Sequence, residues 1–171
     1  MRILLAALVV CLITTPALAT NKHRHPQAPH HKLPHPCHVK VCTITDYAAA
    51  IRKIESSNRY GIRTNAGKGR FALGAYQIMD FNLKRWSIEA LGREVSQEEF
   101  LKNPYIQDEI FEYKFQQYIK KYGSPETAAR IWLAGEGGYK SNHADIFGTT
   151  PSKYALRFMH ALRGILGVFG V

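Results

Sequence analysis

The spacing of apolar residues after Thr45 predicts a series of helices separated by short gaps. Apolar side chains recur three and four positions apart, and Ser, Thr or Asn, often followed by Pro, stands where several of these helices would begin. No stretch alternates convincingly between apolar and polar residues, so we predict no strand. The predicted helices cover residues 46–56, 80–91, a short segment after Ser96, 104–122, 125–135 and a last segment from 151, with long loops over 57–74 and 135–149. The expected fold class is mainly α.

The helix predicted between Asn103-Pro104 and Gly123 has the widest apolar stripe. Thr45 is the expected N-cap of the first helix, and Ser96 with Glu99 has the pattern of a capping box for the short third helix. The stripe of the 104–122 helix consists of Ile106, Ile110, Phe111, Phe115, Tyr118, Ile119 and Tyr122. Such a width indicates deep burial of this helix.

Residues 1–19 have the pattern of a secretory signal peptide. Arg2 precedes an apolar run over residues 3–13, and Ala17-Leu18-Ala19 is a small-x-small cleavage site. The alternative, an uncleaved membrane anchor, fits less well because Pro16 and the cleavage site interrupt the segment. We therefore expect an exported protein, periplasmic or extracellular, with no stable membrane span once residues 1–19 are removed.

Residues 20–44 differ from the rest of the chain in composition. The part over 20–38 has four prolines, six histidines and almost no apolar residue, so we expect a basic tail or linker without a core. The histidines are spaced irregularly, and we expect solvated side chains rather than a metal site at His23, His25, His30 and His31. Four residues separate Cys37 from Cys42, which permits a small disulfide loop in an oxidising compartment. Free thiols or an intermolecular bridge are the alternatives.

Composition and charge place residues 45–171 among folded domains of ordinary size. The chain of 171 residues is 46% hydrophobic and 21% charged, which is typical of a globular protein and excludes a low-complexity chain. Its formal net charge is +10. In an exported protein this charge suits anionic envelope polymers and phospholipid head groups as partners, and no nucleic acid partner is expected. The alternative is that the charge serves only solubility.

Glu55 is the first candidate for chemistry. It lies near the end of the first predicted helix, where the negative end of the helix dipole disfavours a charged carboxylate. Apolar surroundings would disfavour the charge further and keep the carboxyl protonated near neutral pH, as a general acid requires. Taken alone, the residue is more simply an ordinary surface glutamate.

Two further segments follow Glu55 along the chain. Gly74-Ala75-Tyr76-Gln77 combines small residues, an aromatic ring and an amide, which suits a groove for a polar ligand. Trp132 precedes a glycine-rich stretch over 135–138, where its ring could stack on a sugar. Each segment also has a simpler explanation. The first could be a loop that leads into a helix, and the second could be a core Trp followed by the end of a helix.

Taken together, these segments resemble the lytic transglycosylases of the lysozyme superfamily. Those enzymes show a helix-terminal Glu-Ser, a Gly-Leu-Met-Gln-like segment and an Ala-Tyr-Asn-Ala-Gly-like segment in this order. Here the places are occupied by Glu55-Ser56, Gly74-Ala75-Tyr76-Gln77 and Trp132-Leu133-Ala134-Gly135, and Tyr154 stands where the family often has a late cleft-lining Tyr. The resemblance covers about residues 46–163. It implies a lysozyme-like helical domain with long cleft-lining loops.

The resemblance also implies an activity. Members of the family cleave the β-1,4 bond between N-acetylmuramic acid and N-acetylglucosamine, with a single Glu as acid and then as base, and form a 1,6-anhydro product. That role falls here to Glu55, and no cofactor is implied. The expected partners are peptidoglycan strands and a secretion or envelope-spanning machine. The implied substrate-binding residues are Ser56, Gly74, Tyr76, Gln77, Trp132, Gly135 and Tyr154.

Two other functions stay open because the sequence departs from the family pattern. Trp132-Leu133 replaces Tyr-Asn, so the phenol and the amide of this segment are lost. A lysozyme-type hydrolase would need a second carboxylate, for which Asp80 and Glu136 are the candidates. We expect Asp80 to cap a helix and Glu136 to be an exposed loop charge. A non-catalytic wall-binding module is the remaining alternative.

Overall fold

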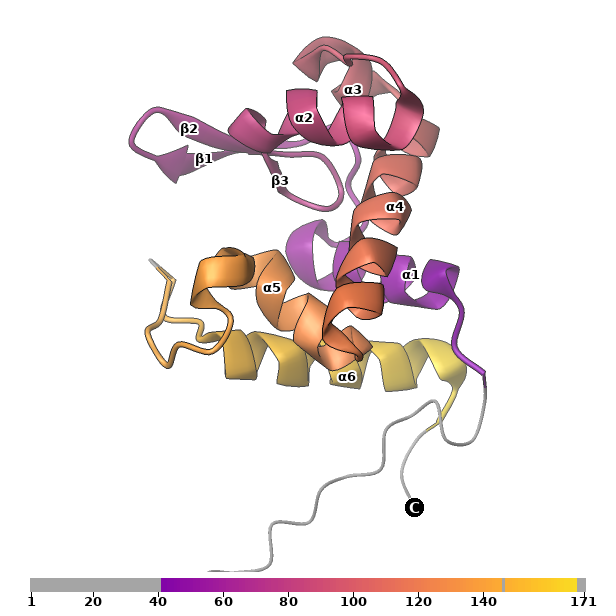
Figure 1. The fold of residues 1–171 in the computed structure, drawn as a ribbon, viewed down its shortest axis with the longest axis vertical. Helices are drawn as coiled ribbons and strands as arrows, with labels where there is room; N and C mark the ends of the chain where they lie inside the picture. Colours follow the sequence, from indigo (N-terminus) through magenta and orange to yellow (C-terminus); the bar gives the residue numbers. More distant parts are fainter. Residues whose placement is uncertain (1–40, 146, 169–171) are drawn as a thin grey trace, which may run out of the picture. The chain divides into compact units, whose positions relative to one another are not determined.

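Helices dominate the described part of the chain, which comprises residues 41–145 and 147–168 of a computed structural model (Figure 1). The prediction of a mainly α fold is thereby confirmed. The elements in order are α1 (Ile44–Ser56), β1 (Arg63–Gly67), β2 (Arg70–Leu73), β3 (Ile78–Met79), α2 (Asp80–Leu91), α3 (Gln97–Lys102), α4 (Pro104–Tyr122), α5 (Pro125–Gly138) and α6 (Pro151–Leu166). No helix among the described residues is long and apolar enough to span a bilayer.

Capping residues set the helix boundaries, with one correction to the prediction. Thr43, and not Thr45, is the N-cap of α1, because its side-chain oxygen accepts the backbone N–H of Asp46 at 3.2 Å. The Asp46 carboxylate accepts the backbone N–H of Thr43 at 2.8 Å in return, which completes a capping box. Ser96 caps α3 as predicted, accepting the N–H of Glu99 at 3.1 Å.

The main correction concerns the loop predicted over 57–74, which contains β1 and β2. These strands form an antiparallel hairpin, and β3 pairs antiparallel with β2 to complete a three-stranded sheet. The hairpin has no clear sequence signal because β1 is exposed at four of its five positions. β3 has two residues, which is too short for any alternating pattern.

Gly135 interrupts α5 but does not end it, contrary to the predicted stop. Its backbone is not helical, with φ 70° and ψ 170°, and one further turn continues to Gly138. The positive φ explains why glycine stands at this kink. The loop that leads to α6 therefore begins at residue 139 rather than at 135.

α4 connects the two sides of the described unit. It packs against α2 and α3 and also against α1 and α5, while α6 lies along α1 and α5 (Figure 1). Phe111 of α4 stacks on Tyr76 with ring centroids 4.2 Å apart and meets Trp132 of α5 edge-on at 4.8 Å. This aromatic centre joins the segment before β3 to α4 and α5. Four residues of the apolar stripe predicted for α4 are buried: Ile106, Ile110, Phe111 and Phe115.

Gln107 of α4 forms hydrogen bonds from inside the core to the backbone of the segment between α1 and α2. Its side chain is fully buried, and Oε1 accepts the backbone N–H of Ala75 at 2.8 Å. Nε2 donates to the carbonyl oxygens of Phe100 at 2.7 Å and Tyr60 at 3.0 Å. Because both the oxygen and the nitrogen of this buried amide have hydrogen-bond partners, the segment is held in one defined position.

Candidate active site

Glu55 is the next-to-last residue of α1, and a tyrosine of α6 holds its carboxyl group. The hydroxyl of Tyr154 donates a hydrogen bond to Glu55 Oε1. Tyr154 is 2% exposed, whereas Glu55 is partly exposed. Two helices distant in the sequence thus present one acid that is fixed in position and still accessible.

Burial raises the pKa of Glu55 to about 7, because the surrounding protein removes water from the charged form. The hydrogen bond from Tyr154 and the positive charge of Arg157 lower the pKa, and the negative charge of Asp145 raises it. A carboxyl with this pKa holds its proton near neutral pH and can both give it up and take it back. This is the property expected of a general acid and base.

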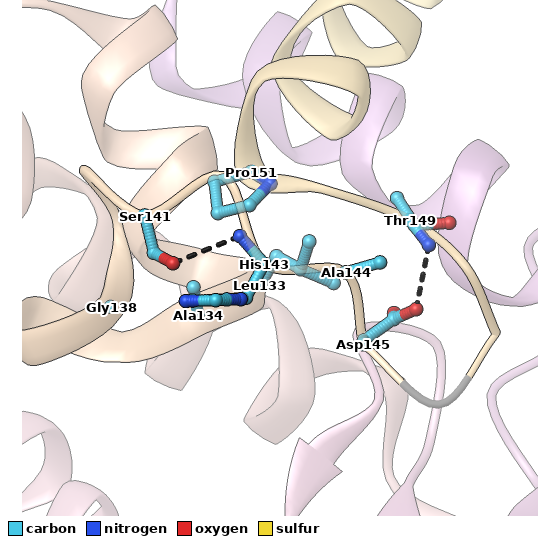
Figure 2. Close-up of a pocket in the computed structure, with 9 residues that line it drawn as sticks. All are labelled: Leu133, Ala134, Gly138, Ser141, His143, Ala144, Asp145, Thr149 and Pro151. Carbon is cyan, nitrogen blue, oxygen red and sulfur yellow. Dashed lines mark hydrogen bonds between the residues drawn. The ribbon is translucent and has the colours of Figure 1, made fainter.

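Asp145 lies in the loop between α5 and α6 and is the carboxylate whose charge acts on Glu55. Its Oδ1 accepts the backbone N–H of Thr149 at 2.8 Å (Figure 2). It also accepts the backbone N–H of Phe147 at 2.9 Å, so a turn fixes its position. Asp145 was not among the residues predicted for the site, although an Asp three positions before Gly148 is a turn pattern.

A cavity of about 240 Å³ adjoins Asp145 (Figure 2). Its wall combines small apolar side chains with the polar groups of the loop. The residues that line it are Leu133, Ala134, Gly138, Ser141, His143, Ala144, Asp145, Thr149 and Pro151.

The two carboxylates proposed from the sequence as partners of Glu55 lie elsewhere. Asp80 is the first residue of α2, whose N-cap is Met79, so the predicted capping role is wrong. Glu136 is exposed as predicted, but it belongs to the last turn of α5 rather than to a loop. It pairs with Lys121 at 3.1 Å, which lowers the pKa of its carboxyl. Neither carboxylate is among the charges that act on Glu55.

Ser56 connects the end of α1 to the segment around Gly74. It is 3% exposed, and its hydroxyl donates to the carbonyl of Ala75 at 2.9 Å and accepts the N–H of Arg59 at 3.0 Å. Gln77 is partly exposed, and its Nε2 donates to the carbonyl of Gly74 at 2.9 Å. Ser56 and Gly74 therefore shape the backbone beside Glu55, and Gln77 is the residue of this segment whose side chain reaches the surface.

Tyr76 is fully buried, so its side chain is not available to a ligand in this structure. Its hydroxyl donates to Asp108 at 2.5 Å and accepts from Arg52 at 2.9 Å. Trp132 donates its indole N–H to the carbonyl of Tyr76 at 3.1 Å. These contacts tie α1, α4 and α5 to the segment before β3.

Trp132 and Gly135 line a second cavity, of about 520 Å³, between β3, α2, α4 and α5. It shares Leu133 and Ala134 with the cavity beside Asp145, so the two hollows adjoin this short piece of α5. The structure thus brings Glu55 and Tyr154 together, whereas Trp132 and Gly135 line the cavity that adjoins the one beside Asp145.

Several predictions concern residues outside the described part of the chain. They are the signal peptide, the basic tail with His23, His25, His30 and His31, and Cys37. Cys42 is disulfide-bonded, and its pairing with Cys37 stays a prediction. Within residues 41–145 and 147–168, no three His, Cys, Asp or Glu side chains form a group that could hold a metal ion.

Two substitutions are expected to move the pKa of Glu55 in opposite directions. Tyr154→Phe removes a hydrogen bond that favours the charged form, so the pKa should rise. Asp145→Asn removes a negative charge but keeps an oxygen for the N–H groups of the turn, so the pKa should fall. Carbon NMR of the labelled Glu55 carboxyl against pH measures both, and shifts of the same sign would contradict the arrangement described above.

Comparisons with protein-family models, with curated proteins and with solved structures found no match to this chain.

Proposed function

We propose that this protein is a lysozyme-like lytic transglycosylase that cleaves peptidoglycan with Glu55 as its single acid and base. The observation that carries the proposal is the Glu55 carboxyl itself, which is partly exposed, has a pKa of about 7 and accepts a hydrogen bond from Tyr154. The order of segments in the sequence supports it independently. The proposal includes export to the periplasm or the cell exterior, and peptidoglycan strands as the partner.

The reaction uses the Glu55 carboxyl twice, first as an acid and then as a base. Glu55 donates its proton to the oxygen that leaves the N-acetylmuramic acid ring, and the bond from that oxygen to the sugar breaks. The resulting carboxylate then takes the proton of the 6-hydroxyl of the same sugar, whose oxygen closes the 1,6-anhydro ring. No water is consumed. A pKa of about 7 suits both steps, and the Tyr154 hydroxyl stabilises the carboxylate between them.

Hydrolysis by the same site is the second candidate, and Asp145 is the observation that favours it. A hydrolase uses a second carboxylate to form a covalent intermediate or to activate water. Asp145 lies close enough to Glu55 for its charge to raise the pKa of the Glu55 carboxyl. In a transglycosylase the same residue acts only through this charge and through the turn that it holds.

The number of reducing ends created during cleavage of peptidoglycan distinguishes a transglycosylase from a hydrolase. A transglycosylase releases soluble fragments from purified peptidoglycan without creating reducing ends, and Asp145→Asn should still release them. A hydrolase creates one reducing end for each bond broken and should lose activity in Asp145→Asn. Release of no fragments by the unmodified protein would support the wall-binding module instead.

A further inference from the structure

The β1–β2 hairpin carries positive charges and no acidic residue. From Ser57 to Met79 the sequence contains Arg59, Arg63, Lys68 and Arg70 but neither Asp nor Glu. The last three lie on the hairpin and are exposed, and none of them forms an ion pair within the described residues. Other surface cations, such as Arg93, lie beside acids, whereas the charge of the hairpin is not neutralised by any acid in the described part of the chain.

Two of these arginines rest on aromatic rings. The guanidinium carbon of Arg63 lies 3.3 Å from the ring centroid of Phe71, and that of Arg70 lies 5.4 Å from the ring centroid of Phe81. A guanidinium held against a ring keeps its N–H edge directed outward, where it can bind both oxygens of a carboxylate. Less side-chain freedom is then lost when an anion binds.

The hairpin lies beside the larger cavity. β2 contacts α2, and Figure 1 shows the hairpin at the edge of the described unit. Phe81, on which Arg70 rests, also lines the cavity of about 520 Å³ that contains Trp132 and Gly135. A chain molecule bound in that cavity would have its side branches within reach of the hairpin.

We infer that the hairpin binds the carboxylates of the peptide branches of a peptidoglycan strand whose sugars occupy the cavity beside it. This inference rests on the proposed function, which supplies the strand. Arg63, Lys68 and Arg70 then select strands that carry charged peptides, while Glu55 acts on the glycan. The hairpin binds substrate and takes no part in the proton transfers.

The test measures binding to soluble, peptide-bearing glycan strands in a Glu55→Gln background, so that the strands stay intact. One variant replaces Arg63, Lys68 and Arg70 with Gln. The matched control also introduces Gln, at Lys84, Lys102 and Lys120, which are exposed lysines on other elements. It therefore removes the same total charge as the hairpin variant. A third variant replaces Arg63 and Arg70 with Lys, which keeps the charge and removes the planar guanidinium. Circular dichroism and thermal unfolding verify that each variant folds.

We expect the hairpin variant to bind peptide-bearing strands roughly tenfold more weakly and the control to bind nearly as the parent does. The Arg→Lys variant should fall between them. Conversion of the strand carboxylates to methylamides should weaken binding by the parent to the same degree and remove the difference between variants.

Three results would overturn the inference. They are equal affinities of the hairpin and control variants, an unchanged difference on methylamidated strands, and tighter binding of duplex DNA than of the strands through the same three residues. Product analysis of the unmodified protein tests the proposed function separately. Anhydro products with no role for the hairpin would reject only this inference, whereas hairpin-dependent binding without cleavage would reject only the transglycosylase.

Discussion

Glu55→Gln is expected to lower the rate of glycan cleavage about a thousandfold or more, because Gln has no proton to donate to the leaving oxygen. The substitution preserves the shape of the side chain and its oxygen can still accept from Tyr154, so the fold should be retained. The release of soluble fragments from peptidoglycan measures the effect. Glu98→Gln is the control, since that carboxyl is exposed on α3 and should leave the rate unchanged. Full activity of Glu55→Gln would end the assignment of Glu55 as the acid.

The same variant should also change how stability depends on pH. The Glu55 carboxyl has a pKa of about 7 in the folded protein and 4.5 as its ordinary value, so the folded state binds its proton more tightly. The stability that this proton contributes is complete below about pH 4.5 and is lost as the pH rises through about 7. At higher pH a carboxylate that has lost hydration destabilises the fold, and Gln does not. Glu55→Gln should therefore gain on the order of 1–3 kcal/mol relative to the parent between about pH 4 and about pH 9.

Urea unfolding at these two pH values measures that gain. Glu136→Gln serves as the control, because its exposed carboxyl pairs with Lys121 and should show no such gain at high pH. A pH-independent difference between Glu55→Gln and the parent would show that the pKa of Glu55 is not raised.

Gly74→Ala is expected to destabilise the fold by about 3 kcal/mol or more. Gly74 has φ +69°, and a Cβ there would lie 2.1 Å from Gln107 Oε1 and 2.9 Å from the ring of Phe100. Gln107 would have to move and would lose its bond to Ala75, which leaves a buried amide unsatisfied. Chemical denaturation at neutral pH measures the loss of stability.

Gly69→Ala distinguishes the two causes of the stability loss in Gly74→Ala, which are the positive φ and the clash with Gln107. Gly69 has nearly the same φ, +70°, but a Cβ there would meet no atom within 4 Å. Its substitution should therefore cost only about 1 kcal/mol, the backbone part of the effect. Equal losses in the two variants would mean that the contact with Gln107 does not determine the position of the segment beside Glu55.

Much of the helical fold follows from local signals in the sequence. The start of α4 at Asn103-Pro104 and its end at Gly123 are properties of a few adjacent residues, and the structure confirms both. The hairpin was missed because both strands are short and β1 is exposed at most of its positions. Gln107 was missed as well, although it lies four positions before Phe111 on the buried face of α4. Its amide can be buried because the carbonyl and N–H groups of other segments reach it, which local pattern does not reveal.

The candidate site was predictable to a smaller extent. The resemblance named Glu55 and Tyr154, and the structure brings their side chains into contact. It also named Tyr76 and Ser56 as substrate-binding residues, but both lie buried because other parts of the chain supply their hydrogen-bond partners. Asp145 carries no signal of its own beyond a turn pattern. Its influence on Glu55 depends on the packing of the loop after α5, which is a tertiary effect.

The mass of the muropeptides released from purified peptidoglycan in ¹⁸O-labelled water tests the central claim most directly. The proposed reaction predicts fragments with an anhydro end, lighter by one water than a hydrolysis product and free of ¹⁸O, that Glu55→Gln does not produce. Fragments with a reducing end that carries one ¹⁸O would contradict the account and identify a hydrolase.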